Sequence, residues 1–136
     1  LGYTQPDHTN IKDEEQQMLN LVNEERQKSG FALLVWDENL AQVGRKHSED
    51  MFEKGYFSHY SQEGEDVGDR LDQAGIIYSI AGENLALAPS VSRAHQGLMN
   101  SEGHKRNILD PAFKKIGIGA IDGGVYGQMY TQVFSN

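Results

Sequence analysis

Apolar residues recur every three or four positions in two long segments of the first half of the chain, and this period predicts amphipathic helices. The first helix is expected from Ile11 to Lys28 and the second from Asp37 to about Lys54. Acidic residues crowd the first turn of the earlier segment, where the helix dipole favours negative charge. Gly30 and Gly55 follow the two segments, as is typical of helix ends.

The middle of the chain predicts two shorter helices with a strand between them. A third helix is expected to stop at Gly75, and the β-branched and aromatic run Ile76–Ile80 then favours a strand. A serine cap at Ser90 or Ser92 begins the fourth helix, which is expected to end near Met99.

The C-terminal part of the chain predicts a β-hairpin. Apolar residues alternate with glycines over Ile116–Ile121, Gly123-Gly124 is a two-residue turn signal, and Val125–Phe134 returns as the partner strand. The glycines of the first strand indicate a close approach by another backbone. The order of elements predicts an α+β fold in which helices cover a small antiparallel sheet.

A length of 136 residues suits a single domain with a hydrophobic core, and we assign it to residues 11–136. Residues 1–10 are polar and aperiodic and are predicted to be a linker or a lightly docked tail. No apolar run reaches the roughly 18 residues of a membrane span, so no transmembrane segment is expected. The N-terminal residues lack the pattern of a signal peptide, and we expect a signal to have been removed or trimmed.

The net charge of −8, without a basic stripe, argues against nucleic acid as a partner. The absence of cysteine excludes disulfides and thiolate metal sites. Neither property indicates an oligomeric state.

Three chemically capable side chains lie beside glycines or turns, namely His59, Glu83 and His104. Two imidazoles and a carboxylate can hold zinc with an open coordination position, or serve as a general acid and base. Ser101 is expected to cap the turn that carries His104, and Glu102 follows it. Because no sequential zinc motif or serine elbow is present, two readings stay open: one shared cleft, or three unrelated capping and bracing residues.

Two other groups have simpler explanations. His47 falls on the buried stripe of the second helix and is expected to be a core histidine bonded to a neighbour. The acids between Glu63 and Asp69 lack the spacing of a calcium loop, so they are expected to form a solvated loop and a helix cap.

Eight segments, in order and in register, resemble the CAP superfamily of cysteine-rich secretory, antigen 5 and plant pathogenesis-related proteins. The likeness is greatest to the cysteine-free bacterial SCP-like extracellular domains, and it extends from about Glu14 to the C-terminus. The matching segments are Leu21–Arg26, Leu34–Leu40, His47–Met51, Phe57–His59, Gly82–Ala86, Ser101–Leu109, Ile116–Gly119 and Tyr130–Phe134.

The resemblance implies a three-layer α-β-α sandwich with a central cleft that two histidines and two glutamates line and that can hold a divalent cation. His59, Glu83 and His104 match three of those four positions. This chain departs from the family at the fourth position, where Ser101 stands in place of the glutamate and Glu102 lies beside it.

We therefore expect a secreted or cell-surface binding module, and favour it over an enzyme. Its cleft would take a small ligand or a divalent cation at His59 and His104, with zinc the candidate and no cofactor required. One alternative is a hydrolase, either protease or nuclease, in which a metal-bound water or His104 acts as the base and Glu83 orients it. Another is a lipid- or sterol-binding protein, and the resemblance also implies host or cell-wall components as partners.

Overall fold

The structure, a computed structural model, describes residues 9–136 of the chain. Its helices are α1 (Lys12–Lys28), α2 (Glu38–Lys54), α3 (Val67–Gln73), α4 (Val91–Met99) and α5 (Glu102–Ile108), with one 3₁₀ turn, η1 (Gly124–Tyr126). Its strands are β1 (Thr9–Asn10), β2 (Val35–Trp36), β3 (Ala81–Ala88), β4 (Lys115–Asp122) and β5 (Gln128–Ser135).

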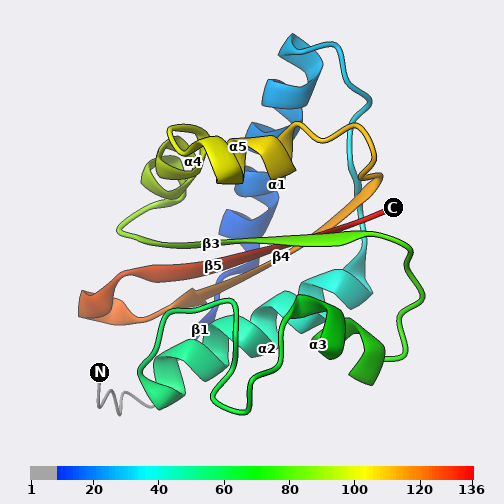
Figure 1. Cartoon of the computed structure of the whole chain (residues 1–136). Coiled ribbons are helices and arrows are strands. Elements are labelled where there is room, and N and C mark those ends of the chain that lie inside the picture. The colour runs from blue at the N-terminus through cyan, green and yellow to red at the C-terminus, as the bar shows by residue number, and fades with distance from the viewer. Residues whose placement is uncertain (1–8) are drawn as a thin grey trace.

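The strands form one sheet in the order β1-β4-β5-β3, with β2 added in parallel against β4. The other pairings are antiparallel, and β3 is an edge strand. Helices α1, α4 and α5 cover one side of the sheet, while α2 and α3 cover the other (Figure 1). The predicted α+β class and three-layer α-β-α sandwich are confirmed.

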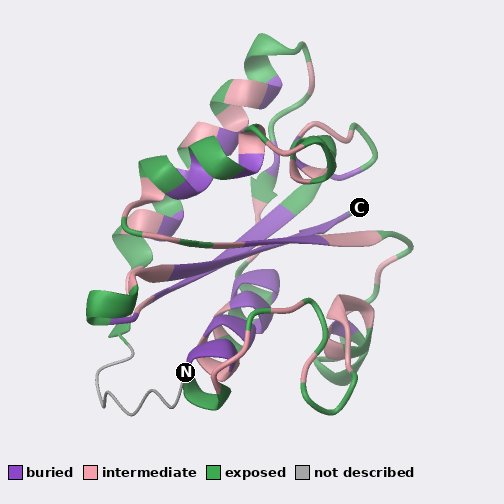
Figure 2. Ribbon diagram, turned by 60° about the vertical axis from the view of Figure 1, so that its left-hand side comes forward, coloured by how far each residue is buried: buried purple, intermediate pink, exposed green. Residues whose placement is uncertain are grey.

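The hydrophobic core lies on both sides of the two central strands, β4 and β5, and Figure 2 shows the buried residues gathered along them. Ile116, Ile118 and Phe134 pack in a buried cluster with residues of α1 and α4. On the other side, Met51 and Phe52 of α2 pack in a cluster with residues of the sheet. This two-sided burial is the main stabilising term for the fold.

Helix α2 lies directly on the backbone of β4 because glycines leave room for it. A Cβ atom at Gly119 would lie 2.0 Å from the backbone nitrogen of Arg45, and one at Gly117 would lie 2.1 Å from that of Ala41. Gly44 faces the same contact from the helix, where an added Cβ would lie 3.0 Å from the nitrogen of Gly119. The prediction that these strand glycines mark a close backbone approach is confirmed.

The strand predicted at Ile76–Ile80 is wrong, since the strand in this region is β3, which begins at Ala81. The β-branched residues lie in a loop, and Ile77 is 98% exposed. Instead of joining the sheet, the backbone amides of Ser79 and Ile80 donate to the Oδ1 atom of Asn136. Glu83 lies within β3.

Two further expectations need correction. Residues 1–8 of the predicted tail lie outside the described residues, but Thr9 and Asn10 form β1 and pair with β4. The hairpin connection is longer than two residues, because η1 separates β4 from β5. The fourth helix was predicted correctly, and the hydroxyl of Ser90 caps it by accepting from the amide of Arg93.

Candidate functional site

The site is built around Glu83 of edge strand β3, whose side chain is buried with 2% of its surface exposed. Its two carboxylate oxygens have separate partners. The Nδ1–H of His59 donates to Oε1 at 2.8 Å, and Nη2 of Arg70 donates to Oε2 at 2.5 Å. Burial of a carboxylate is costly unless it is paired, and these two bonds supply a partner for each oxygen of Glu83.

The loop that carries His59 is anchored from beneath by two helices. Nε2 of His47, on α2, donates to the carbonyl of Ser58 at 2.8 Å. Arg70, on α3, donates from Nη1 to the carbonyls of His59 (3.2 Å) and Glu65 (2.9 Å). His47 is 2% exposed, which confirms it as a core histidine bonded to a neighbour. Together these contacts fix the position of His59.

His104 approaches β3 from the opposite layer, on α5. Its Nδ1 lies 2.8 Å from the hydroxyl of Ser101, and its carbonyl accepts from Nδ2 of Asn84 at 3.0 Å. Asn107, one turn further along α5, donates to Oδ1 of Asn84 (2.8 Å) and to the carbonyl of Glu83 (3.3 Å). This amide network ties α5 to the edge strand and sets the height of the His104 ring above it.

Ser101 therefore occupies the predicted helix-cap position without the predicted capping bond. Its hydroxyl contacts the His104 ring instead. Glu102 is exposed and lines a different hollow, which also contains Phe31 and Arg106. Of the two residues beside the missing family glutamate, Ser101 is the one in contact with the histidine.

The two imidazoles differ in their protonation behaviour. The hydrogen bond to Glu83 is the main cause that raises the pKa of His59 above its ordinary value, against a smaller opposing effect of burial. Burial lowers the pKa of His104, and the charge of His59 lowers it further. Because the two pKa values shift in opposite directions, His59 is protonated before His104 as the pH falls.

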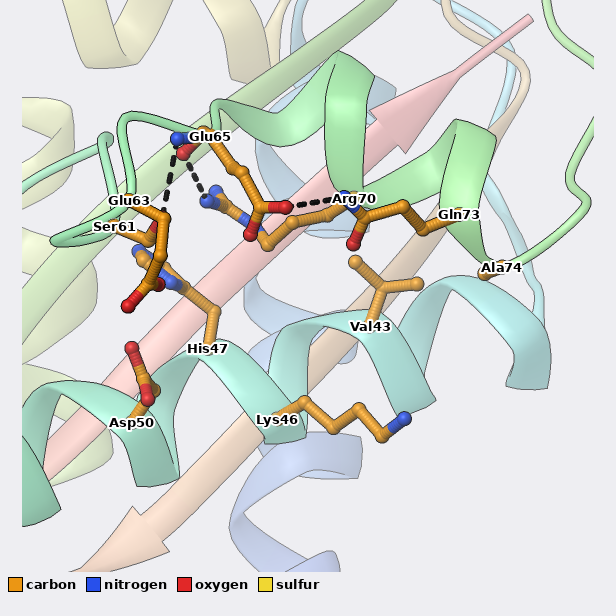
Figure 3. A pocket seen from close by; sticks show the side chains of 10 residues that line it. All are labelled: Val43, Lys46, His47, Asp50, Ser61, Glu63, Glu65, Arg70, Gln73 and Ala74. Carbon is orange, nitrogen blue, oxygen red and sulfur yellow. Dashed lines mark hydrogen bonds between the residues drawn. The ribbon is translucent and has the colours of Figure 1, made fainter.

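A hollow of about 250 Å³ lies beneath the His59 loop (Figure 3). His47 and Asp50 reach it from α2 and Arg70 reaches it from α3, while Glu63 and Glu65 close it from the loop. Among the acids of this loop, Glu63 pairs with Lys54 and Asp66 caps α3. Lys54 also pairs with Asp50 of α2. This agrees with the expected solvated loop and helix cap.

The donor atoms of the site limit how it could hold a metal ion. Within residues 9–136 no group of three or more His, Asp or Glu side chains is placed to hold an ion. The expected three-ligand set does not form, because both oxygens of Glu83 are engaged by His59 and Arg70. The protein donors left for a cation are the Nε2 atoms of His59 and His104, which form no hydrogen bond in the described part of the chain.

Three residues that position the site were not identified from the sequence. Arg70 gave no signal, because an arginine on a short helix next to acidic residues is typical of a solvated face. Asn84 and Asn107 lie inside two of the segments that carry the family resemblance, Gly82–Ala86 and Ser101–Leu109, and could have been found there.

Among the helices of the described residues, none has the length and apolar character needed to cross a membrane. Residues 19–134 match the profile of the cysteine-rich secretory protein family, CAP. The uncharacterized protein YkwD of Bacillus subtilis is 40% identical over 121 residues, which cover 88% of this chain and 46% of that protein. The chain thus spans about half the length of this relative.

Two solved structures have the same fold. An extracellular protein containing an SCP domain from Bacillus anthracis is 38% identical with a TM-score of 0.83, over 92% of this chain and 41% of that one. An outer surface protein from Borrelia burgdorferi has a TM-score of 0.88 at 19% identity, over 95% of this chain and 98% of that one. The profile match shows that this chain, although free of cysteine, belongs to the cysteine-rich secretory protein (CAP) family.

Proposed function

We propose that this chain is an extracellular binding module in which the Nε2 atoms of His59 and His104 take a divalent transition-metal cation, with zinc the candidate, or a small ligand in its place. The observation that carries the proposal is the bond from His59 Nδ1–H to Glu83, whose other oxygen is held by Arg70. It fixes one tautomer of His59 and leaves Nε2 with a free lone pair.

This arrangement is the one found around metal-binding histidines. Such a histidine commonly donates its second ring N–H to a carboxylate, which orients the ring and makes the ligating nitrogen more basic. His104 obtains the same orientation when its Nδ1–H donates to the hydroxyl of Ser101. Two oriented imidazoles leave further coordination positions to water or to a ligand, so a bound cation would be open to an external partner.

The same contacts argue against a hydrolase that uses Glu83 as its general base. A general base must accept a proton from water or substrate, but the Glu83 carboxylate already accepts one hydrogen bond on each oxygen. His59 and Arg70 thus occupy both oxygens through which Glu83 would accept that proton. Its role is to position His59.

The extracellular setting is supported by the relatives. The Bacillus anthracis protein that is 38% identical to this chain is described as extracellular, and the matching family is named for secretion. That protein is more than twice as long as the matched region, since this chain covers 41% of it. A partner such as a cell-wall component or a host molecule is therefore a further part of the proposal.

Calorimetric titration with zinc tests the proposal. We expect one cation per chain for the unmodified protein, and an affinity at least about tenfold weaker for His59→Ala and for His104→Ala. Glu102→Gln is the matched control, because it removes a neighbouring acid that does not contact either ring, and it should leave the heats unchanged. Equal heats in the unmodified protein and in the double histidine variant would reject the cation site.

A further inference from the structure

In edge strand β3, the main-chain N–H and C=O groups of every second residue point away from β5, toward the open edge of the sheet. The carbonyl of Glu83 faces outward, since it accepts from Nδ2 of Asn107 and not from β5. Neighbouring residues on a strand direct their N–H and C=O groups to opposite edges. The main-chain groups of Leu85 and Leu87 therefore also face outward.

The opposite edge of the sheet gives the same result. The carbonyl of Ala120 accepts from the amide of Ile11, so Ala120 faces away from β5. Tyr130 is opposite Ala120 on one side and opposite Ala86 on the other. Tyr130 thus directs its main chain to β3 and bonds Ala86, which leaves the two neighbours of Ala86 facing outward.

A groove of about 230 Å³ runs along this outward edge. The strand lines it from Leu85 to Ala88, and α4 and the start of α5 form its other wall. That wall consists of Arg93, Ala94, Gly97, Leu98, Ser101 and His104. The groove is therefore apolar along its length and polar at its two ends.

The outward main-chain N–H and C=O of Leu85 lack hydrogen-bond partners among the described residues. It is 5% exposed, yet no group within residues 9–136 hydrogen-bonds its outward N–H or C=O. Buried main-chain groups are almost always paired, and an unpaired one costs free energy. Leu87, which is 43% exposed, presents a second outward N–H and C=O. The groove thus offers main-chain donors and acceptors in the spacing of a strand.

We propose that the groove binds a short extended peptide, which adds to β3 as a further strand opposite Leu85 and Leu87. Alternating N–H and C=O groups along a strand edge are complementary to another extended backbone. This site is distinct from the cation site, although His104 borders both.

Charge at the ends of the groove indicates which peptide it prefers. Arg93 lies near the Leu87 end, is exposed, and forms no ion pair among the described residues. A carboxylate of the peptide, either from an acidic side chain or from the C-terminus, is the natural partner for that guanidinium. We therefore expect an acidic residue at this end and apolar residues opposite the strand.

The test is a positional-scanning library of N-acetylated octapeptides, added to the ¹⁵N-labelled chain with EDTA present. We expect bound peptides to shift the amide resonances of Leu85 and Leu87 and to slow their hydrogen exchange. The best peptides, resynthesised with N-methyl groups at alternate amides, should lose at least about tenfold in affinity, because the side chains remain but the strand pairing is lost. EDTA removes any contribution from a cation, so failure of the cation site does not affect this result.

Variants of the chain provide a second readout. Leu87→Pro removes an outward N–H without breaking the ladder to β5 and should abolish binding, while Leu87→Val keeps that N–H and should bind normally. Arg93→Glu should reverse the preference for an acidic residue. The proposal is overturned if no library member shifts Leu85 and Leu87, if N-methylated peptides bind equally well, or if these amides shift with protein concentration alone, which would mean that a second copy of the chain covers the edge.

Discussion

Replacing Arg70 with methionine tests how the site is held together. The change keeps an unbranched apolar stem but removes the guanidinium that bonds Glu83. The side chains of Arg70 and Glu83 are 11% and 2% exposed, so the loss leaves a carboxylate buried with His59 as its remaining side-chain partner. Breaking a buried pair on one side costs about 3–5 kcal/mol. Because Arg70 is partly exposed, we expect about 3 kcal/mol.

The loss should depend on pH in a defined direction. The pKa of His59 is raised by Glu83, so the attraction between protonated His59 and Glu83 is fully present below the unfolded pKa of about 6.5 and is lost as the pH rises through the folded pKa. The charge of Arg70 lowers the pKa of His59, so in Arg70→Met the ring is protonated more readily and its attraction to Glu83 offsets part of the loss. The variant should therefore be less destabilised at about pH 5.5 than at about pH 8.

Urea denaturation at the two pH values measures the effect, and thermal unfolding should show a midpoint lower by roughly 10 °C at the higher pH. Arg93→Met is the control, since this arginine is exposed and unpaired within the described residues, and it should change stability by less than about 0.5 kcal/mol. A loss below about 1 kcal/mol for Arg70→Met, equal at both pH values, would refute the clamp on Glu83.

Three more predictions follow from the geometry. Gly119→Ala should cost about 3 kcal/mol or more in urea denaturation, because its Cβ would lie 2.0 Å from the backbone of α2, whereas Gly103→Ala on open α5 should gain about 0.5–1 kcal/mol; similar values for the two would contradict the contact. Arg26→Met should cost about 3 kcal/mol, since it leaves four buried or part-buried carbonyls without their donor, and a loss within 0.5 kcal/mol would show that water replaces it. Zinc affinity should fall at least about tenfold between about pH 7.5 and about pH 5.5, because protonated His59 cannot ligate a cation, and a flat calorimetric profile would exclude His59 as a ligand.

The helices were predictable because their signal is local. The stripe of α2, with Leu40, Val43, His47 and Met51, recurs at helical spacing, and Asp37 caps the helix as expected. The close packing at the glycines of β4 could also be predicted, because glycine inside a strand has few uses other than close packing. In these cases one segment contains both the pattern and its physical cause.

The failures share a different cause. Ile76–Ile80 has the composition of a strand, but strand formation requires a partner edge, and β3 meets β5 only from Ala81 onward. The parallel pairing of β2 with β4 is likewise decided by the packing of distant segments. Local propensity cannot report such long-range pairings.

Part of the candidate site could be predicted from the sequence and part could not. His59, Glu83 and His104 could be selected because each lies beside a turn or a glycine and matches a family segment. The division of roles could not, since it depends on Arg70 reaching the second oxygen of Glu83 from a helix thirteen residues earlier. That contact changes Glu83 from an expected ligand into the residue that orients one.

The most direct measurement of the central claim is a long-range ¹H–¹⁵N correlation spectrum of the histidine rings during a zinc titration. If His59 and His104 form one site, a single equivalent of zinc shifts the Nε2 resonances of both rings together. Nδ1 of His59 should meanwhile keep its proton and continue to donate it to Glu83. If zinc shifts only one of these rings, or shifts another histidine first, the two imidazoles do not share a ligand and the proposed binding site is wrong.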